Sequence, residues 1–237
     1  MVIVPAMDIL LIGGLWLRPS VWDAVVSDLA DRGHTARAVH LPGQGDGDRS
    51  ATLAGQIKEV ITAVDTANGR PVAVGHSAAS NLAWVAADTR PEKVGSVVLI
   101  GGLPTPDGKA YADFFPIENG EMPFPGWGAF EGPDSADLDE AQKQAFERSA
   151  IPVPEGVARG IVHLTDERRF DVPVVLVCPE FSPADARKWI EQGAVPELAR
   201  ARHLAFVDID SGHWPMVTAP TALASLLSDI ASGSLPD

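Results

Sequence analysis

Residues 74–79 of the chain read Val-Gly-His-Ser-Ala-Ala and lie between a short apolar run and a helical pattern. The apolar run at 71–74 predicts a buried strand, and residues 81–88 predict a helix just after the turn. A serine at such a strand-to-helix turn is held in a strained backbone conformation, so the residues two places before and after it must be small. Gly75 and Ala79 meet this requirement. The stretch therefore predicts that Ser77 is a nucleophile on an α/β fold.

Outside this stretch, apolar β-rich runs alternate with longer helical patterns along the 237 residues. The predicted strands are 9–12, 35–40, 71–74, 94–100, 172–178 and 204–209. The predicted helices are 21–32, 52–68, 81–88, 137–149 and 221–232. Alternation of this kind predicts one α/β domain with a mostly parallel central sheet and helices on both faces.

Residues 103–171 interrupt the alternation with a connection that is long for two neighbouring core strands. The segment is rich in proline and carries six aromatic residues before its helical stretch: Tyr111, Phe114, Phe115, Phe124, Trp127 and Phe130. We interpret it as a cap over the carboxyl edge of the sheet, where open α/β sheets bind their ligands. Residues 1–102 and 172–237 then form the core.

A serine hydroxyl is a poor nucleophile until a base takes its proton, and the chain holds six histidines. His213 lies directly after the last predicted strand and before the last predicted helix. We predict that His213 is the base. His76 is predicted to pack in the core or line the pocket, because its side chain points away from that of its neighbour Ser77.

With these residues in place, the chain resembles the α/β-hydrolase superfamily, and within it the small serine esterases of the methylesterase and hydroxynitrile-lyase branch. The resemblance covers most of the chain outside the cap. It includes the loop 13–22, which is similar to a His-Gly-x-x loop with a downstream tryptophan, although Gly13 replaces the histidine. The resemblance implies a triad in the order serine, acid, histidine. It also implies an oxyanion hole formed by the N–H groups of Leu15 and Ala78.

The resemblance places the acid a few residues after the strand 172–178, where residues 179–185 read Pro-Glu-Phe-Ser-Pro-Ala-Asp. Glu180 is the first candidate because it is nearest to the strand end, and a glutamate reaches further than the usual aspartate. Asp107 is the second, because some members of the superfamily take the acid from the loop after an earlier strand. Asp185 is the third, and its expected role is to cap a helix.

Composition excludes several other functions. The formal net charge of −14 argues against nucleic acid and anionic membranes as partners, because both bind positive charge. The single cysteine, Cys178, rules out an internal disulfide and falls in a predicted buried strand. The chain shows no signal-peptide pattern and no apolar run long enough for a membrane span, so we expect a cytoplasmic protein. No metal or cofactor is expected, because metal-ligand spacings are missing and Asp48 breaks the dinucleotide pattern of the loop 43–47.

Trp16, Trp214 and the aromatic residues of the cap suggest an apolar pocket. We therefore expect a serine hydrolase that cleaves a small, largely apolar carboxylic ester or lactone. Two alternatives stay open. One is a binding or receptor-like protein with minimal turnover, and the other is a cofactor-free oxygenase or a lyase that uses His213 as its base. The related lyases use a lysine near the acid, and residues 181–184 contain none.

Overall fold

The computed structural model describes residues 7–234, in which six strands form one parallel sheet. Its strands are β1 (Asp8–Ile12), β2 (Thr35–Ala38), β3 (Val72–His76), β4 (Ser96–Ile100), β7 (Val174–Cys178) and β8 (Leu204–Asp208). The spatial order is β2-β1-β3-β4-β7-β8, and every neighbouring pair is parallel. The predicted sheet is confirmed, with strand ends that differ by one or two residues from the predicted ones.

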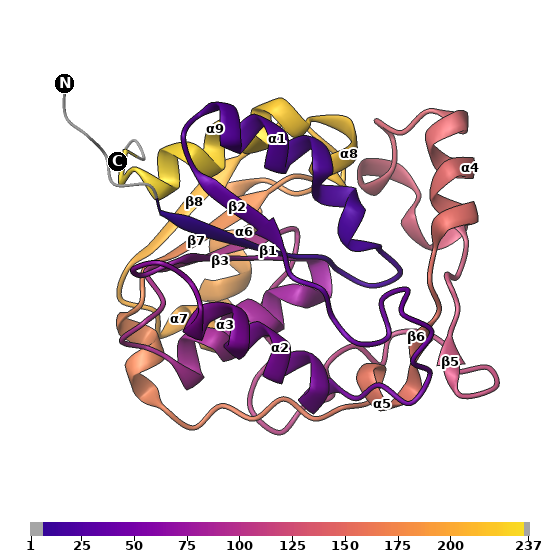
Figure 1. Ribbon diagram of the computed structural model, residues 1–237, viewed down its shortest axis with the longest axis horizontal. Helices are drawn as coiled ribbons and strands as arrows, with labels where there is room; N and C mark the ends of the chain where they lie inside the picture. Colours follow the sequence, from indigo (N-terminus) through magenta and orange to yellow (C-terminus); the bar gives the residue numbers. More distant parts are fainter. Residues whose placement is uncertain (1–6, 235–237) are drawn as a thin grey trace.

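Helices cover both faces of the sheet (Figure 1). On one face, α1 (Asp23–Asp31) packs against α9 (Pro220–Ala231), and on the other α2 (Leu53–Asp65) packs against α3 (Ser80–Thr89). The inner strands β1, β3 and β7 are buried along their whole length, because a parallel sheet between two helical layers has no solvated face. The other helical segments outside residues 103–171 are η1 (Pro19–Trp22), η2 (Ser77–Ala79), α6 (Pro183–Glu191), α7 (Pro196–Ala199) and α8 (Pro215–Thr218).

The start of α6 accounts for one of the candidate acids. Ser182 caps the helix by accepting a hydrogen bond from the Asp185 N–H at 3.1 Å, and the Asp185 carboxylate accepts from the Ser182 backbone N–H at 3.3 Å. This reciprocal pair is a capping box, which satisfies backbone donors that the first helical turn leaves free. The expected capping role of Asp185 is confirmed.

The cap, residues 103–171, runs between β4 and β7. It contains β5 (Glu121–Met122), η3 (Trp127–Phe130), η4 (Gly132–Asp134), α4 (Glu140–Ser149), β6 (Val153–Pro154), α5 (Glu155–Ala158) and η5 (Glu167–Asp171). The antiparallel pair β5–β6 and α4 lie beyond the carboxyl ends of the strands, on the right of Figure 1. The later part returns along the core, where α5 contacts α2 and η5 contacts α3. Hydrogen bonds join residues 108–112 to residues 158–162 of this returning part, so the middle of the segment, from β5 to β6, is the part that lies beyond the sheet edge in Figure 1.

Within residues 7–234, no helix combines the length and the apolar character needed to cross a bilayer.

Candidate active site

Ser77 occupies the turn between β3 and α3 with a φ of +54°, in the left-handed region that a non-glycine residue rarely adopts. Strain of this kind costs about 1–3 kcal/mol and persists only where the surroundings enforce it. Here the wholly buried β3 and the almost wholly buried α3 hold the turn from both sides. A Cβ on Gly75 would overlap the carbonyl oxygen of Ala79, so the turn requires glycine before the serine. Ala79 has an ordinary φ of −67°, which explains why alanine replaces glycine after it.

Glu180 and His213 meet at the carboxyl edge of the sheet. Glu180 follows β7 and His213 follows β8, which are neighbouring parallel strands. The His213 Nδ1–H donates to Glu180 Oε1 at 2.7 Å, and each side chain is only 12% exposed. With Nδ1 protonated, Nε2 of the neutral ring is the atom that can take up a proton. Among the described residues, no hydrogen bond joins the Ser77 hydroxyl to this ring, a contact that is often long before substrate binds.

His76 joins the Ser77 turn to residues 209–214, the loop between β8 and α8 that carries His213 and is called the histidine loop below. Its Nε2–H donates to the backbone carbonyl of His213 at 2.7 Å, and the two ring centroids lie 5.0 Å apart. Complete burial, together with the nearby charge of His213, lowers the pKa of His76 to about 3. The ring is therefore neutral at physiological pH, and its single proton lies on Nε2. The side chain packs in the core beside the site, as the sequence predicts.

The loop after β1 contains Leu15, and Gln44 orients this loop. A role for Gln44 at the site was not expected from the sequence. The Gln44 amide donates to the carbonyl oxygens of Gly13 and Gly14, both at 3.2 Å. In a trans peptide the C=O and the following N–H point in opposite directions, so the Gly14 carbonyl facing Gln44 directs the Leu15 N–H the other way. That N–H has no acceptor among the described residues. A Cβ added to Gly14 would lie 3.1 Å from Ser77 Cβ, which places the loop directly against the serine.

Ala78, the other predicted donor, lies in the first helical turn after Ser77, where N–H groups lack an intrahelical acceptor. The backbone N–H groups of Leu15 and Ala78, which come from two different loops next to Ser77, thus resemble the arrangement that stabilises an oxyanion.

Aromatic rings from the cap and the core surround His213. The Phe130 ring lies nearly parallel to the imidazole at 6.4 Å, and Trp214 meets it edge-on at 4.9 Å. Trp16 contacts the Phe130 ring at 5.9 Å and donates from Nε1 to the Met122 carbonyl of β5. The cluster continues through Phe115, Phe124, Trp127 and Phe146. Beside it lies a mostly apolar cavity of about 240 Å³, bordered by Trp16, Phe146 and Arg18.

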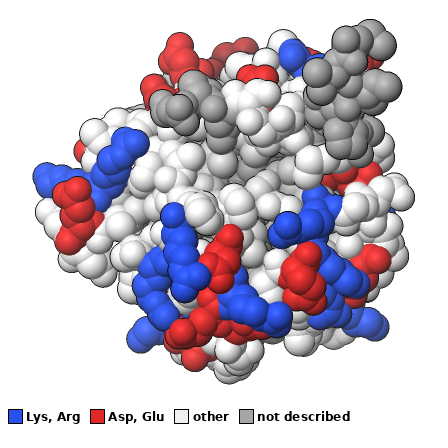
Figure 2. Space-filling view, turned by 90° about the vertical axis from the view of Figure 1, so that its left-hand side faces the viewer, with Lys and Arg blue, Asp and Glu red and all other residues white. Residues whose placement is uncertain are grey.

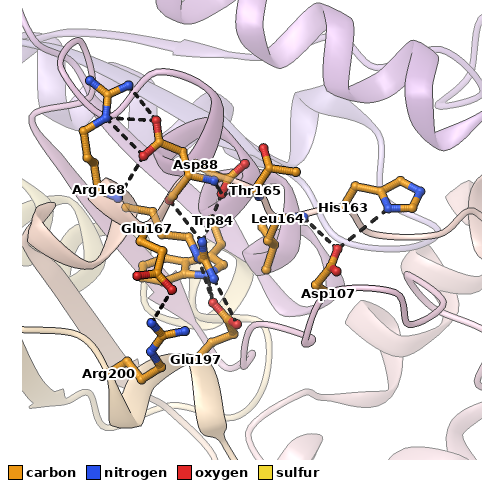
Figure 3. A network of polar contacts seen from close by, with 12 residues as sticks. Trp84, Asp88, Asp107, His163, Leu164, Thr165, Glu167, Arg168, Glu197 and Arg200 are labelled. Carbon is orange, nitrogen blue, oxygen red and sulfur yellow. Dashed lines mark hydrogen bonds and ion pairs between the residues drawn. The ribbon is translucent and has the colours of Figure 1, made fainter.

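Asp107 lies in a different environment from Glu180. Its carboxylate accepts a hydrogen bond from the Leu164 N–H at 2.9 Å and lies 3.7 Å from the His163 ring, as Figure 3 shows. Among the described residues it has no polar contact with His213. The contacts of Asp107 instead join the start of the cap to its returning end.

Cys178 ends β7 close to Glu180 and is completely buried, as predicted. Burial, with a smaller contribution from the carboxylates of Asp208 and Glu180, raises the pKa of its thiol to about 12. A thiol in this state is a poor nucleophile. Within residues 7–234, no group of three or more His, Cys, Asp or Glu side chains is arranged to hold a metal ion.

Comparison with known proteins places this geometry in a family. The sequence profile of the Alpha/beta hydrolase family matches residues 9–226. A search of curated proteins found no match. Among solved structures, an extracellular α/β-hydrolase from a Paenibacillus species has a TM-score of 0.73 at 20% identity, covering 93% of this chain and 97% of that one. It is described as sharing structural and functional homology with Tobacco Salicylic Acid Binding Protein 2.

Two further structures are comparably similar. A methylesterase from Arabidopsis has a TM-score of 0.72 at 14% identity, with 96% of this chain and 100% of that one covered. A pyrethroid hydrolase from Sphingobium faniae has a TM-score of 0.68 at 21% identity, with 95% and 97% covered. At these identities the likeness establishes the fold, and the profile match over most of the chain establishes the family. The predicted resemblance is confirmed at this level: the chain belongs to the alpha/beta hydrolase family.

Proposed function

We propose that the protein is a serine hydrolase that cleaves small, largely apolar carboxylic esters or lactones. The observation that carries the proposal is the 2.7 Å pair of Glu180 and His213 beside a Ser77 turn with φ +54°. A base oriented by a carboxylate next to a serine in a strained turn is the arrangement that nucleophilic catalysis requires. The cytoplasmic location and the small-molecule partner expected from the sequence belong to the same proposal.

In the proposed reaction, the Ser77 oxygen attacks the ester carbonyl while His213 Nε2 takes up the hydroxyl proton. The resulting oxyanion accepts hydrogen bonds from the N–H groups of Leu15 and Ala78. The protonated imidazole then gives its proton to the leaving alcohol, which yields an acyl-serine. Water, deprotonated by His213, releases the acid and restores Ser77. Throughout, Glu180 holds the Nδ1–H and stabilises the imidazolium.

The surroundings support an apolar substrate. The rings of Phe130 and Trp214 border the histidine, and Trp16 packs against Phe130. The cavity on the border of which Trp16 lies is lined mainly by apolar side chains. Rings of this kind exclude water from the reacting carbonyl, which strengthens the hydrogen bonds to an oxyanion. No negatively charged group of a substrate would find a matched cluster of cations here, since within residues 7–234 Arg18 is the one cation on the cavity border.

The experiment combines a fluorophosphonate probe with turnover of neutral nitrophenyl esters. The wild type should be labelled, and Ser77→Ala should lose both labelling and at least about 10⁴-fold in kcat. Glu180→Gln should lower kcat by about 10³- to 10⁴-fold. The matched control is Asp107→Asn, which keeps an oxygen for the Leu164 N–H and should retain wild-type turnover. Full esterase turnover by Ser77→Ala would overturn the proposal, and oxygen consumption by that variant would favour the oxygenase alternative.

A further inference from the structure

The histidine loop is attached to the cap through consecutive hydrogen bonds. The Gly212 N–H donates to the Asp137 carboxylate at 2.6 Å, and the Ser211 hydroxyl donates to the same oxygen at 3.3 Å. One residue further, the His213 N–H donates to the Asp134 carbonyl at 2.8 Å. We call residues 134–137, which link η4 to the start of α4, the cap loop. Three successive residues that end at the candidate base therefore bind the cap loop.

Gly212 shows how closely the two loops approach each other. Its φ lies outside the left-handed region, so the backbone conformation alone would accept a side chain. A Cβ at this position would nevertheless overlap Asp137 Oδ1 and lie 2.5 Å from the Asp134 carbonyl oxygen. Gly212 is also buried. The position therefore requires glycine because the cap loop presses on it.

The cap loop is ordered by its own contacts, and the loop that carries His213 is also bound to the core. Ser135 is buried at 3% exposure, and its carbonyl accepts from the Leu138 N–H at 3.2 Å. On the core side, the Ser211 hydroxyl lies 3.0 Å from the Thr218 hydroxyl of α8. The histidine loop is thus held between a core helix and the cap. Without the cap loop, the N–H groups of Gly212 and His213 would lose their acceptors.

The charges around His213 come from several elements. Glu180 follows β7, and His76 belongs to β3 and is neutral. Asp134 lies at the end of η4, where partial burial raises the pKa of its carboxyl. The nearby charge of Glu180 acts in the same direction, and that of His213 opposes it. The cap loop therefore lies within electrostatic range of the Glu180–His213 pair as well as in hydrogen-bonded contact with its backbone.

We propose that Asp137 is a positioning residue for His213, so that docking of the cap and alignment of the base are one event. This inference rests on the proposed function, in which His213 is the base. The carboxylate holds the backbone just before His213, and this sets where Nε2 lies relative to Ser77. Misplacement of a reacting group by about 1 Å can cost about 10²-fold in rate. A cap that lifts to admit substrate would release these bonds, and the base would be realigned only on closure.

The test uses the full chain with three variants. Asp137→Ala removes the acceptor and should lower kcat for a neutral nitrophenyl ester by about 10- to 100-fold, with a smaller change in KM. Asp137→Asn keeps an oxygen acceptor without the charge and should stay within about threefold of the wild type. Asp139→Ala is the matched control, because Asp139 caps α4 in the same cap but binds only the Gln142 N–H. It should lower the Tm and leave kcat unchanged.

A second readout does not depend on turnover. The Nδ1–H proton of His213, which is hydrogen-bonded to Glu180, should give a downfield proton resonance in the NMR spectrum. We expect this resonance to broaden or move in Asp137→Ala and to persist in Asp137→Asn and Asp139→Ala. If Asp137→Ala keeps both the wild-type kcat and the wild-type resonance, the inference is wrong. If Ser77→Ala is fully active, the proposed function fails while the resonance still reports on the loop.

Gly212→Ala provides an independent route should Asp137→Ala fail to fold. The added methyl group pushes the cap loop away while Asp137 itself is retained. It should reproduce the fall in kcat and the change in the resonance. A folded Gly212→Ala with wild-type values of both would also overturn the inference.

Discussion

At the scale of single residues, His76 couples the site to the pH dependence of stability. Its pKa in the folded chain is about 3, below the ordinary value of 6.5, because the charged ring cannot be solvated inside the core. Between these two values the unfolded chain binds a proton that the folded chain does not. Stability contributed by the neutral ring is therefore complete above pH 6.5 and is lost as the pH falls toward 3.

Replacement of His76 by glutamine should make this coupling visible. The amide can still donate to the His213 carbonyl, but it does not titrate. As the pH falls below 6.5, the free energy of unfolding of the wild type should decrease by up to about 1.4 kcal/mol per pH unit more than that of His76→Gln. Urea unfolding between pH 7 and pH 4.5 measures the difference. The exposed His203→Gln is the control for loss of one imidazole, and parallel pH profiles of wild type and His76→Gln would contradict the assignment.

At the scale of elements, a buried ion-pair network joins α3, η5 and α7. Arg169, 4% exposed, donates to Glu197 at 2.9 Å and to Asp88 at 3.2 Å, and the Trp84 indole donates to the same Glu197 oxygen. Figure 3 shows this network between the helices and the returning cap. Because two carboxylates share one guanidinium, loss of the cation leaves buried negative charge without a partner. The network therefore holds the end of the cap segment to the core.

Arg169→Met should accordingly lower the free energy of unfolding by about 3–5 kcal/mol. The neighbouring Arg168 is the matched control, because its ion pair with Asp166 is largely exposed. Arg168→Ala should cost about 0–1 kcal/mol. Both values are measured by denaturant unfolding at neutral pH. Equal losses in the two variants would show that burial of the network does not matter.

The elements of the fold also differ in how far the sequence alone could predict them. The strands were predictable because each is an apolar run between turn residues, and Ser77 because its turn demands small neighbours at fixed positions. Contacts between distant parts of the chain leave no such pattern: Gln44 binds Gly14 across 30 residues, and Asp137 binds Gly212 across 75. The sequence also could not show which carboxylate contacts His213. That contact depends on β7, which precedes Glu180, being the neighbour of β8, which precedes His213. The two-residue strands β5 and β6 were too short to produce any periodicity.

At the scale of the whole molecule, acidic groups outnumber basic ones by 32 to 18, which gives the net charge of −14. On the face seen in Figure 2, Lys and Arg side chains alternate with Asp and Glu and form no continuous basic patch. Many basic side chains are in ion pairs, including Arg90 and Lys93 with Asp65 and Arg200 with Glu167. The field around the molecule is therefore negative on average and repels anions.

The exception is Arg18, which borders the apolar cavity lined by Trp16 and Phe146 and forms no ion pair with any described residue. Two esters of similar size, a neutral nitrophenyl acetate and an anionic nitrophenyl hemisuccinate, separate the global field from this local cation. If the global field dominates, kcat/KM of the anionic ester should rise several-fold as ionic strength increases from about 0.01 to about 0.15 M, where the Debye length falls from about 30 to about 8 Å. The neutral ester should show no such dependence. An anionic ester that instead reacts faster at low salt would indicate attraction by a local cation. Arg18→Gln should then abolish the preference, because no other cation of the described residues lies on the cavity border.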